Sequence, residues 1–296
     1  MRTPETLIDH VAKLISRGGP EPAEFFDLLT VFDEINAQKD CIAPIAGQLI
    51  KESDGAFNSL NTMQGHVCQS PYGYYGDFHI IDRIYNNDIS LDPSLAKWDE
   101  FFHWGTAAVA VRNRKTFFLT HYIPRIMGSD DPMRLLNVGS GPCRDVAELL
   151  LKIGGTPITI DCVDADHRGF DYAKDVVGLS DDRVNFIQKN ALRLNGPARY
   201  DMIWSAGLFD YLDDKLFVAL TRRLGRLLLP KGEIVIGNFS NLNTQMGYMA
   251  FGGWNLRHRS AEDLLSLSIR AGFEPACCEV LQEPTGVNLF LHVRLP

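Results

Sequence analysis

The sequence predicts an α/β fold, in which a helical N-terminal region precedes a parallel β-sheet that ends in an antiparallel hairpin. From Arg134 onward, short apolar runs alternate with helical stretches, as in parallel strands joined by crossover helices. The last two apolar runs, 273–282 and 287–295, are separated only by the residues EPTG. Because this gap is too short for a crossover helix, we expect these strands to be antiparallel neighbours.

The first 128 residues are expected to form a helical region that covers the open end of the sheet. The segments LIDHVAKLI and AEFFDLLTVFDEINA have apolar residues at helical spacing, and a third helix is expected from about Ser94 to about Met127. The residues GSDDP at 128–132 mark a break. We therefore predict a helical region at 1–128 and a core domain at 129–296.

The core domain is expected to contain seven strands. Besides the terminal pair, strands are predicted at 134–138, 157–164, 183–187, 200–206 and 232–239. Helices are predicted at about 143–153, 168–177, 213–228 and 260–271. A long insertion at 240–259 follows the fifth strand, and insertions of this length in compact domains are often lids or binding loops.

The composition is that of a globular domain, with 45% apolar and 22% charged residues. A formal net charge of −8 argues against a nucleic-acid substrate, which would require a basic face. The sequence contains no run of about 18 apolar residues, so no membrane span is predicted. The N-terminus lacks the basic-then-apolar pattern of a secretory signal. We therefore expect a cytoplasmic protein with neither a membrane nor a nucleic-acid partner.

The cysteines and histidines show no spacing typical of a metal site. The eight histidines form no H-x-x-x-H motif and no evident His/Asp pair, so no metal is expected. The cysteines form no C-x-x-C pair, which indicates free thiols in a reducing cytosol. They are Cys41, Cys68, Cys143, Cys162, Cys277 and Cys278.

The first predicted strand of the core runs into a glycine loop, within the stretch LLNVGSGPCRD at 135–145. A phosphate loop of the Walker type needs Lys and Ser/Thr after its last glycine, but Gly141 is followed by Pro, Cys and Arg. The dinucleotide fingerprint G-x-G-x-x-G requires a small third residue, and Arg144 stands there. Gly139 and Gly141 therefore indicate only that a ligand approaches the backbone closely.

Further candidate ligand-binding residues follow the next three predicted strands. Asp164 ends the second strand, 25 residues after Gly139, and an acid at this place can accept hydrogen bonds from both hydroxyls of a ribose. Asn190 and Ala191 follow the third strand, where the edge of an adenine would lie. The fourth strand ends in WSAGLFDYL, which predicts an apolar and aromatic pocket wall.

Together, these residues resemble the class I S-adenosylmethionine-dependent methyltransferases over about residues 134–296. The resemblance implies a Rossmann-like seven-stranded sheet that binds the cofactor S-adenosyl-L-methionine. The glycine loop would contact its methionine part, Asp164 its ribose, and the residues after the third strand its adenine. The implied cofactor residues in the core are Gly139, Ser140, Gly141, Asp164, Ala165, Asn190, Ala191, Ser205 and Gly207.

The resemblance has one departure and two alternatives. The third loop glycine of the family is Cys143 here, and this residue is small enough for the loop to keep its shape. The alternatives are a nicotinamide-dependent oxidoreductase and a domain of this fold that has lost its ligand.

Three further stretches resemble a bacterial methyltransferase subfamily that pairs this core with a helical N-terminal region. They are PYGYYGDFHIIDRIY (71–85), AGLFDYLDD (206–214) and GNFSNLNTQMGYMAFGGWNLRHRSAEDL (237–264). Some members of the subfamily are described as makers of 3-hydroxy fatty acid methyl ester signals.

The tyrosine-rich loop suggests how a sulfonium methyl donor could be kept dry. The faces of aromatic rings attract a sulfonium cation, so Tyr72, Tyr74 and Tyr75 could close the pocket. Tyr72, Tyr74 and Asp77 are therefore predicted to contact the cofactor. Alternatively, Asp77 caps the following helix, FHIIDRIY, and the loop is purely structural.

Six residues are candidates for the substrate side of the reaction, namely Tyr75, His103, Asp210, Tyr211, Trp254 and His258. Asp210 and Tyr211 follow the fourth strand, where class I enzymes commonly place substrate-facing residues. Alternatively, Asp210 caps the helix predicted at 213–228.

Cations and aromatic residues in the insertion suit an acidic substrate with an apolar tail or a planar aromatic acid. The cations are Arg257, His258 and Arg259, and the alternative is that the aromatic residues pack against the helical region. Arg112, Arg114 and Lys115 are expected to form a solvated face, unless one of them binds a carboxylate.

The predicted function is methylation of a small molecule by a methyl donor that is already activated, so the protein mainly supplies orientation and water exclusion. Since no general base is evident, O-methylation of a carboxylate or a hydroxyl on an acyl or secondary metabolite is favoured, with attack by a carboxylate preferred because it needs no base. The alternatives are N- or C-methylation of an aromatic or amino-acid-derived natural product, and a non-catalytic sensor of the cofactor. The apolar N-terminal helices are compatible with a homodimer.

Overall fold

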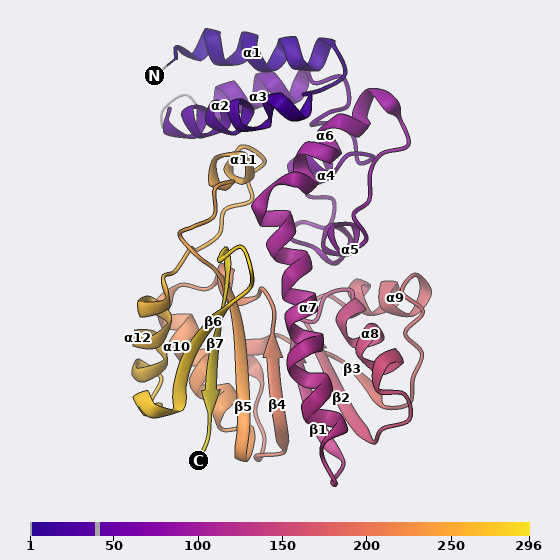
Figure 1. Ribbon diagram of the computed structural model, residues 1–296, viewed down its shortest axis with the longest axis vertical. Helices are drawn as coiled ribbons and strands as arrows, with labels where there is room; N and C mark the ends of the chain where they lie inside the picture. The colour runs from indigo at the N-terminus through magenta and orange to yellow at the C-terminus, as the bar shows by residue number, and fades with distance from the viewer. Residues whose placement is uncertain (1, 39–41) are drawn as a thin grey trace. The chain divides into compact units, whose positions relative to one another are not determined.

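The computed structural model describes residues 2–38 and 42–296, so Cys41 lies outside the described residues. The chain divides into two compact units. One, the helical unit, comprises Met1–Val111 and Asn243–Asn255; the other, the sheet unit, comprises Arg112–Leu242 and Leu256–Pro296 (Figure 1). Within 2–38 and 42–296, no helix is long and apolar enough to cross a membrane.

The helical unit is built from short helices that bury their apolar sides. Its helices are α1 (Pro4–Ser16), α2 (Phe25–Ala37), α3 (Ile42–Lys51), α4 (Met63–Gln69), α5 (Phe78–Asn86), α6 (Pro93–Trp104) and α11 (Met246–Phe251). Polar residues fix where several of them start. The side chains of Thr3, Thr62 and Asp77 accept hydrogen bonds from first-turn N–H groups of α1, α4 and α5.

The single helix predicted from about Ser94 to about Met127 is two helices, α6 and α7 (Thr106–Met127), separated at Gly105. A Cβ on Gly105 would lie 1.6 Å from Nε2 of Gln245. Gln245 Oε1 in turn accepts a hydrogen bond of 2.8 Å from the N–H of Ala107, in the first turn of α7. A side chain about 140 residues away in sequence thus helps to cap α7, which also runs from the helical unit into the sheet unit.

The sheet unit contains one seven-stranded sheet in the order β3-β2-β1-β4-β5-β7-β6. The strands are β1 (Met133–Val138), β2 (Ile158–Asp164), β3 (Val184–Gln188), β4 (Tyr200–Ser205), β5 (Leu228–Phe239), β6 (Cys278–Gln282) and β7 (Asn288–Arg294). The first five are parallel, and β7 is antiparallel to both β5 and β6. This confirms the predicted α/β fold with its terminal hairpin.

The strand order reverses between β1 and β4, and this reversal positions the site. In open α/β sheets, ligands bind beyond the carboxyl ends of the strands at such a switch point. The helices of the unit are α7, α8 (Arg144–Ile153), α9 (Arg168–Asp175), α10 (Asp214–Gly225) and α12 (Ala261–Arg270). All four helices predicted for the core are present, with ends that differ by a few residues.

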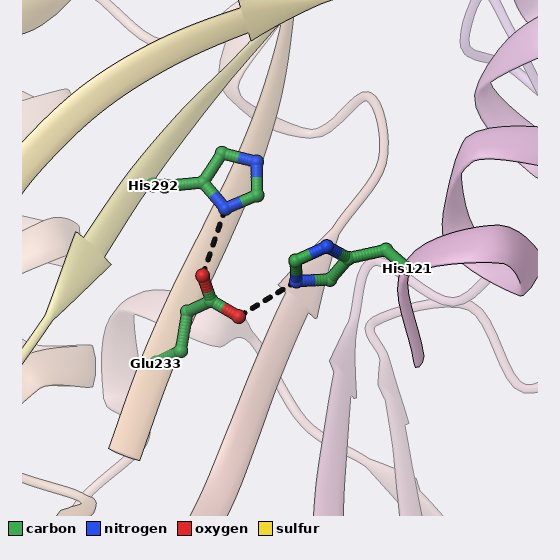
Figure 2. Close-up of side chains that lie close together, drawn as sticks. All are labelled: His121, Glu233 and His292. Carbon is green, nitrogen blue, oxygen red and sulfur yellow. Dashed lines mark hydrogen bonds and ion pairs between the residues drawn. The ribbon is translucent and has the colours of Figure 1, made fainter. Parts of the chain in front are cut away.

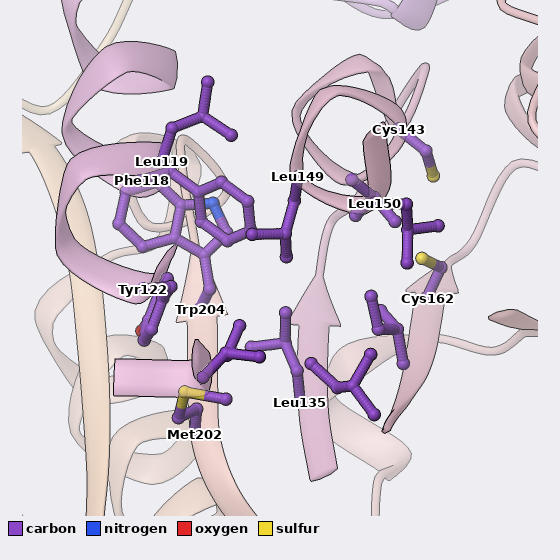
Figure 3. Close-up of a cluster of buried hydrophobic side chains, with 14 of the residues drawn as sticks. Phe118, Leu119, Tyr122, Leu135, Cys143, Leu149, Leu150, Cys162, Met202 and Trp204 are labelled. Atoms are coloured by element: carbon purple, nitrogen blue, oxygen red, sulfur yellow. The ribbon is translucent and has the colours of Figure 1, made fainter. Parts of the chain in front are cut away.

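An apolar core on one face of the sheet holds α7 and α8 against the strands. Figure 3 shows the side chains of Phe118 and Tyr122 from α7 beside Trp204 of β4. All three are fully buried, and the rings of Phe118 and Trp204 have centroids 5.2 Å apart. A second core, which includes Phe217 of α10 and Leu264 of α12, lies on the other face. Because apolar cores cover both faces of the sheet, a ligand can reach it only at the ends of the strands.

The insertion at 240–259 largely belongs to the helical unit, since Asn243–Asn255 fall within it. Its helix α11 packs against α2, where the ring centroid of Tyr248 lies 4.7 Å from that of Phe32. Phe251 makes a second contact with Phe32, at 5.0 Å. Tyr248 and Phe251 therefore pack against a helix of this unit, as in the alternative to a substrate-facing lid.

Candidate functional site

The glycine loop between β1 and α8 has the left-handed backbone that glycine permits. The φ angles of Gly139 and Gly141 are +66° and +53°. Cys143, with φ of +53°, has a similar conformation without being glycine. The N–H groups of Gly139 and Ser140 both donate to the carbonyl of Val163, at 2.8 and 3.2 Å, which fixes the loop against the end of β2.

Asp164 ties the glycine loop to the second strand. Its Oδ2 accepts a hydrogen bond of 3.0 Å from the N–H of Gly141, and its Oδ1 accepts one of 3.0 Å from the N–H of Asp166. Burial raises the pKa of Asp164. The backbone N–H of Ala165 also bonds this carboxylate. A carboxylate has about four acceptor positions, so Asp164 can still accept a further hydrogen bond, as from a ribose hydroxyl.

Two features of the loop fit a polar ligand above it. The Oγ of Ser140 is buried and has no hydrogen-bond partner within the described part of the chain. A Cβ placed on Gly141 would meet no atom within 4 Å, so the space there is open. A buried hydroxyl without a partner beside open space is satisfied when a ligand supplies the partner.

A charged cluster lies at the end of β4, next to the glycine loop. A Cβ on Gly139 would lie 3.0 Å from Cβ of Leu208, so the turn after β4 adjoins the loop. A Cβ on Gly207 would lie 2.7 Å from Nη1 of Arg114 and 3.5 Å from Oδ2 of Asp210. Arg114 is 7% exposed, so the expectation that it lies on a solvated face is wrong.

Asp210 is a buried acid at this turn. Its Oδ1 accepts a hydrogen bond of 2.7 Å from the N–H of Phe239, at the end of β5. Burial raises the pKa of Asp210 to about 7, against the opposing effects of that bond and of the charges of Arg114 and Arg259. The alternative that Asp210 caps α10 is wrong, because Asp213 occupies the cap and accepts from the N–H of Leu216.

Sequence reasoning missed Asp145, a second buried acid at the start of α8. Burial raises the pKa of Asp145 to about 6, while Val146 and Arg114 lower it. The Nδ2 of Asn137 in β1 lies 3.5 Å from its Oδ2. An acid in the first helical turn after a glycine loop was the available signal, since the helix dipole favours negative charge there.

Other predicted cofactor residues have structural contacts. Ser205 is fully buried, and its hydroxyl donates to the carbonyl of Val138 at 2.9 Å. The Oδ1 of Asn190 accepts from the N–H of Leu192 at 2.9 Å, at the start of the short 3-10 turn Ala191–Arg193. Ala165, directly after Asp164, is exposed at the end of β2.

In the helical unit, Asp77 caps α5, as the structural alternative predicted. Its Oδ1 accepts from the N–H groups of His79 and Ile80, and its Oδ2 lies 2.9 Å from Nε2 of His66. Asp77 and His66 are both nearly fully buried. The expectation that the chain has no His/Asp pair is therefore wrong. Tyr72 packs on Phe78, with ring centroids 4.4 Å apart.

The remaining candidates in the helical unit lie in different surroundings. A Cβ on Gly253 would lie 2.3 Å from the hydroxyl oxygen of Tyr75, so the tyrosine loop packs on the insertion. Trp254 is buried, whereas Tyr74 is 38% exposed. The Nε2 of His103 donates to the carbonyl of Asp88 at 2.7 Å, which is a structural bond.

In the sheet unit, Tyr211 is exposed at the turn after β4, and His258 is half-buried. Desolvation on burial lowers the pKa of His258. The neutral imidazole is therefore the form favoured at pH 7.

Two histidines that are far apart in sequence meet at one carboxylate in the sheet unit (Figure 2). Glu233 of β5 accepts from Nε2 of His121 at 2.7 Å and from Nδ1 of His292 at 2.8 Å. These donor atoms are spaced closely enough for a metal ion. However, Arg125 and Arg294 also donate to Glu233, at 3.0 and 2.8 Å, and their two positive charges favour an ion-pair network over a cation.

Comparison with known proteins agrees with this geometry. Residues 135–232 match the family model described as a methyltransferase domain. The comparison with curated protein sequences found no match. The match to a methyltransferase domain and the strand order of the sheet agree with the predicted enzyme class and with S-adenosylmethionine as the methyl donor.

Solved structures show the same fold at low sequence identity. A possible exported protein from Bordetella parapertussis is 15% identical, with a TM-score of 0.63 over 100% of this chain and 97% of that chain. The methyltransferase SibL is 16% identical, with a TM-score of 0.51 over 88% and 76%. Magnesium protoporphyrin IX methyltransferase from Synechocystis, with bound S-adenosylhomocysteine, is 11% identical, with a TM-score of 0.52 over 78% and 97%.

Proposed function

We propose that the protein O-methylates a small molecule, with Asp210 as the base that takes the proton of an acceptor hydroxyl. The supporting observation is the position of this acid. It lies beside Gly207, at the carboxyl end of β4, in a turn that adjoins the glycine loop. Burial raises its pKa to about 7, so the carboxylate accepts protons near neutral pH.

We further propose that Gly139, Ser140, Gly141 and Asp164 hold S-adenosylmethionine, and that Asn190 and Ala191 flank its adenine. When bound, the donor supplies an activated methyl group on a sulfonium. The Ser140 hydroxyl and the remaining acceptor capacity of Asp164 would meet polar groups of the donor. The positive charge of the Arg114 guanidinium would stabilise a negative charge near the methionine end of the donor.

A carboxylate acceptor stays the second candidate, because a carboxylate is ionised at neutral pH and needs no base. We propose an acyl compound or a secondary metabolite as the substrate class, a cytoplasmic location and a homodimer. N- or C-methylation is the alternative chemistry. A cofactor sensor without turnover is the alternative from another class of protein.

One experiment separates these functions. Purified protein is incubated with S-adenosylmethionine and a small-molecule cell extract, and products are identified by mass spectrometry. We expect a metabolite to gain one methylene unit on oxygen, with loss of that product in Asp210→Asn at pH 7. Cofactor that binds but is not consumed would indicate a sensor, and a product methylated on oxygen at an undiminished rate in Asp210→Asn would favour a carboxylate acceptor.

A further inference from the structure

The sheet unit contains a cavity whose lining residues serve neither as the base nor as cofactor ligands in the proposed methyl transfer. It has a volume of about 420 Å³ and lies between the segment Leu256–Arg259 and α12. We call it the arginine pocket, because Arg257, Arg259 and Arg270 line it. The sequence had suggested only that cations in the insertion suit an acidic ligand.

The charges around the arginine pocket do not cancel. Arg259 is buried and neutralised: its guanidinium donates to the carbonyls of Phe209 and Leu212 and to the side chains of Asn238 and Asp214. Asp263, the other acid that lines the pocket, is held by Ser260 in the capping box of α12, and these bonds lower its pKa and keep it charged. Three arginines and two carboxylates therefore line the pocket, which leaves an excess of positive charge.

Arg257 and Arg270 are the cations left over. Both are exposed, and neither takes part in an ion pair within residues 2–38 and 42–296. Two cations without a carboxylate partner therefore line a hollow in a chain whose formal net charge is −8. Arginine pairs at one cavity are suited to carboxylate and phosphate groups, which they bind with paired N–H donors.

The rest of the lining fits a small organic anion. Leu256 and Leu267 offer apolar surface, and Ser266 and His258 add polar groups. A ligand with one anionic group and a short apolar part would match these surroundings.

Backbone hydrogen bonds connect the arginine pocket to the candidate base. The N–H of Arg257 donates to the carbonyl of Asp210 at 2.8 Å, and the N–H of Arg259 donates to the carbonyl of Phe239 at 2.9 Å. Phe239 also donates its own N–H to the Asp210 carboxylate. The segment that lines the pocket is thus held by Asp210 itself and by Phe239, which also holds the Asp210 carboxylate.

We propose that the arginine pocket binds the carboxylate or phosphate group of a small organic anion between Arg257 and Arg270. The anionic group belongs either to a remote part of the methyl acceptor or to a separate effector. In both cases the pocket is distinct from the glycine loop.

The test measures anion binding without turnover, so it stays informative even if the protein methylates nothing. Inorganic phosphate and succinate are titrated calorimetrically into the full chain at low salt. We expect at least one to bind, and the double variant Arg257→Gln/Arg270→Gln to weaken binding at least ~10-fold, because two charge-assisted contacts are lost. Arg226→Gln, an exposed arginine at the end of α10, is the control and should change nothing.

The outcomes are distinct. Absence of binding by both anions at millimolar concentration, or equal binding by the wild type and the double variant, overturns the proposal. Binding of S-adenosylhomocysteine should be the same in all three proteins, which reports that the double variant is folded. Once anion binding is shown, methylation of the cell extract by the double variant is measured. Its loss means that the anionic group belongs to the methyl acceptor, and unchanged methylation means that it belongs to a separate effector.

Discussion

Buried carboxylates occur in two regions of the sheet unit, and their surroundings are opposite. Glu233 accepts hydrogen bonds from two histidines and two arginines, so all its acceptor positions are used. Burial alone would raise the pKa of Glu233, but the hydrogen bonds from His121 and His292 hold this pKa well below its usual range. Asp210 has one backbone donor and a pKa raised by burial to about 7.

The comparison shows that the number of donors, rather than burial, decides what a buried acid does. Glu233 is fully buried and is held as a permanent charge that joins α7, β5 and β7. Asp210 is about as deeply buried but accepts fewer hydrogen bonds than Glu233, so it gains and loses a proton near neutral pH. The first arrangement serves stability and the second suits proton transfer.

The largest expected effect is on the Glu233 network. Glu233→Gln should lower the free energy of unfolding by about 3–5 kcal/mol, because it leaves buried donors without their charge. Denaturant unfolding at pH 7 measures this. Glu279→Gln is the matched control: Glu279 is an exposed partner of Arg294, and its loss should cost below about 1 kcal/mol. Equal losses in the two variants would contradict the distinction drawn between the two regions.

The next effect is at Asp210. Asp210→Asn should lower kcat at pH 7 by about 100-fold if the acid is a general base. The substitution keeps an oxygen that accepts from the N–H of Phe239. Asp213→Asn, which preserves the cap of α10, is the control and should leave kcat unchanged.

The same Asp210→Asn variant has a stability signature with a defined sign. Because the folded-state pKa of Asp210 is raised from 3.8 to about 7, its favourable contribution is fully present below pH 4 and is lost as pH rises through 7. The stability of the variant relative to the wild type should therefore rise between about pH 4 and pH 7 and stay constant above pH 7. Identical pH dependence of unfolding in both proteins would remove Asp210 as a titrating group.

A smaller effect is expected at Asp164. Asp164→Ala should weaken binding of S-adenosylhomocysteine about 30-fold, since it removes charge-assisted acceptors for the ribose and frees the N–H of Gly141. Calorimetric titration measures the affinity. Asp182→Ala, at an exposed position before β3, provides the control. If the two variants bind equally well, Asp164 is not part of the cofactor site.

Much of the fold follows from local sequence pattern. The seven strands and the terminal hairpin were predictable because β-like runs, their spacing and the short EPTG link are all local features. The break at Gly105 was not, because its cause is the side chain of Gln245, which is close only in the folded chain. For the same reason, the assignment of Asn243–Asn255 to the helical unit could not be predicted.

The candidate site was predictable to a similar extent. The conformation of Gly139 and Gly141 and the contact of Asp164 with the loop follow from a motif of contiguous residues and one spacing. Arg114 was assigned to a solvated face because nothing in its own helix shows that Gly207 leaves space for a guanidinium. The networks around Glu233 and His66 likewise join side chains from separate elements.

The smallest expected effect concerns Cys143, where the family's third glycine is replaced. A left-handed conformation costs a non-glycine residue roughly 1–2 kcal/mol, so Cys143→Gly relieves strain. The substitution also removes a fully buried thiol and adds backbone freedom, which together cost about as much. We therefore expect a change in unfolding free energy within about 1 kcal/mol and unchanged affinity for S-adenosylhomocysteine.

Cys143→Ala separates the two contributions, because it keeps the strain and removes the sulfur. It should be less stable than Cys143→Gly by about 1 kcal/mol, measured by thermal unfolding under identical conditions. The reverse order would show that the loop needs a side chain at this position more than it needs conformational freedom. The glycine of the family would then serve close approach of the ligand rather than the backbone angle.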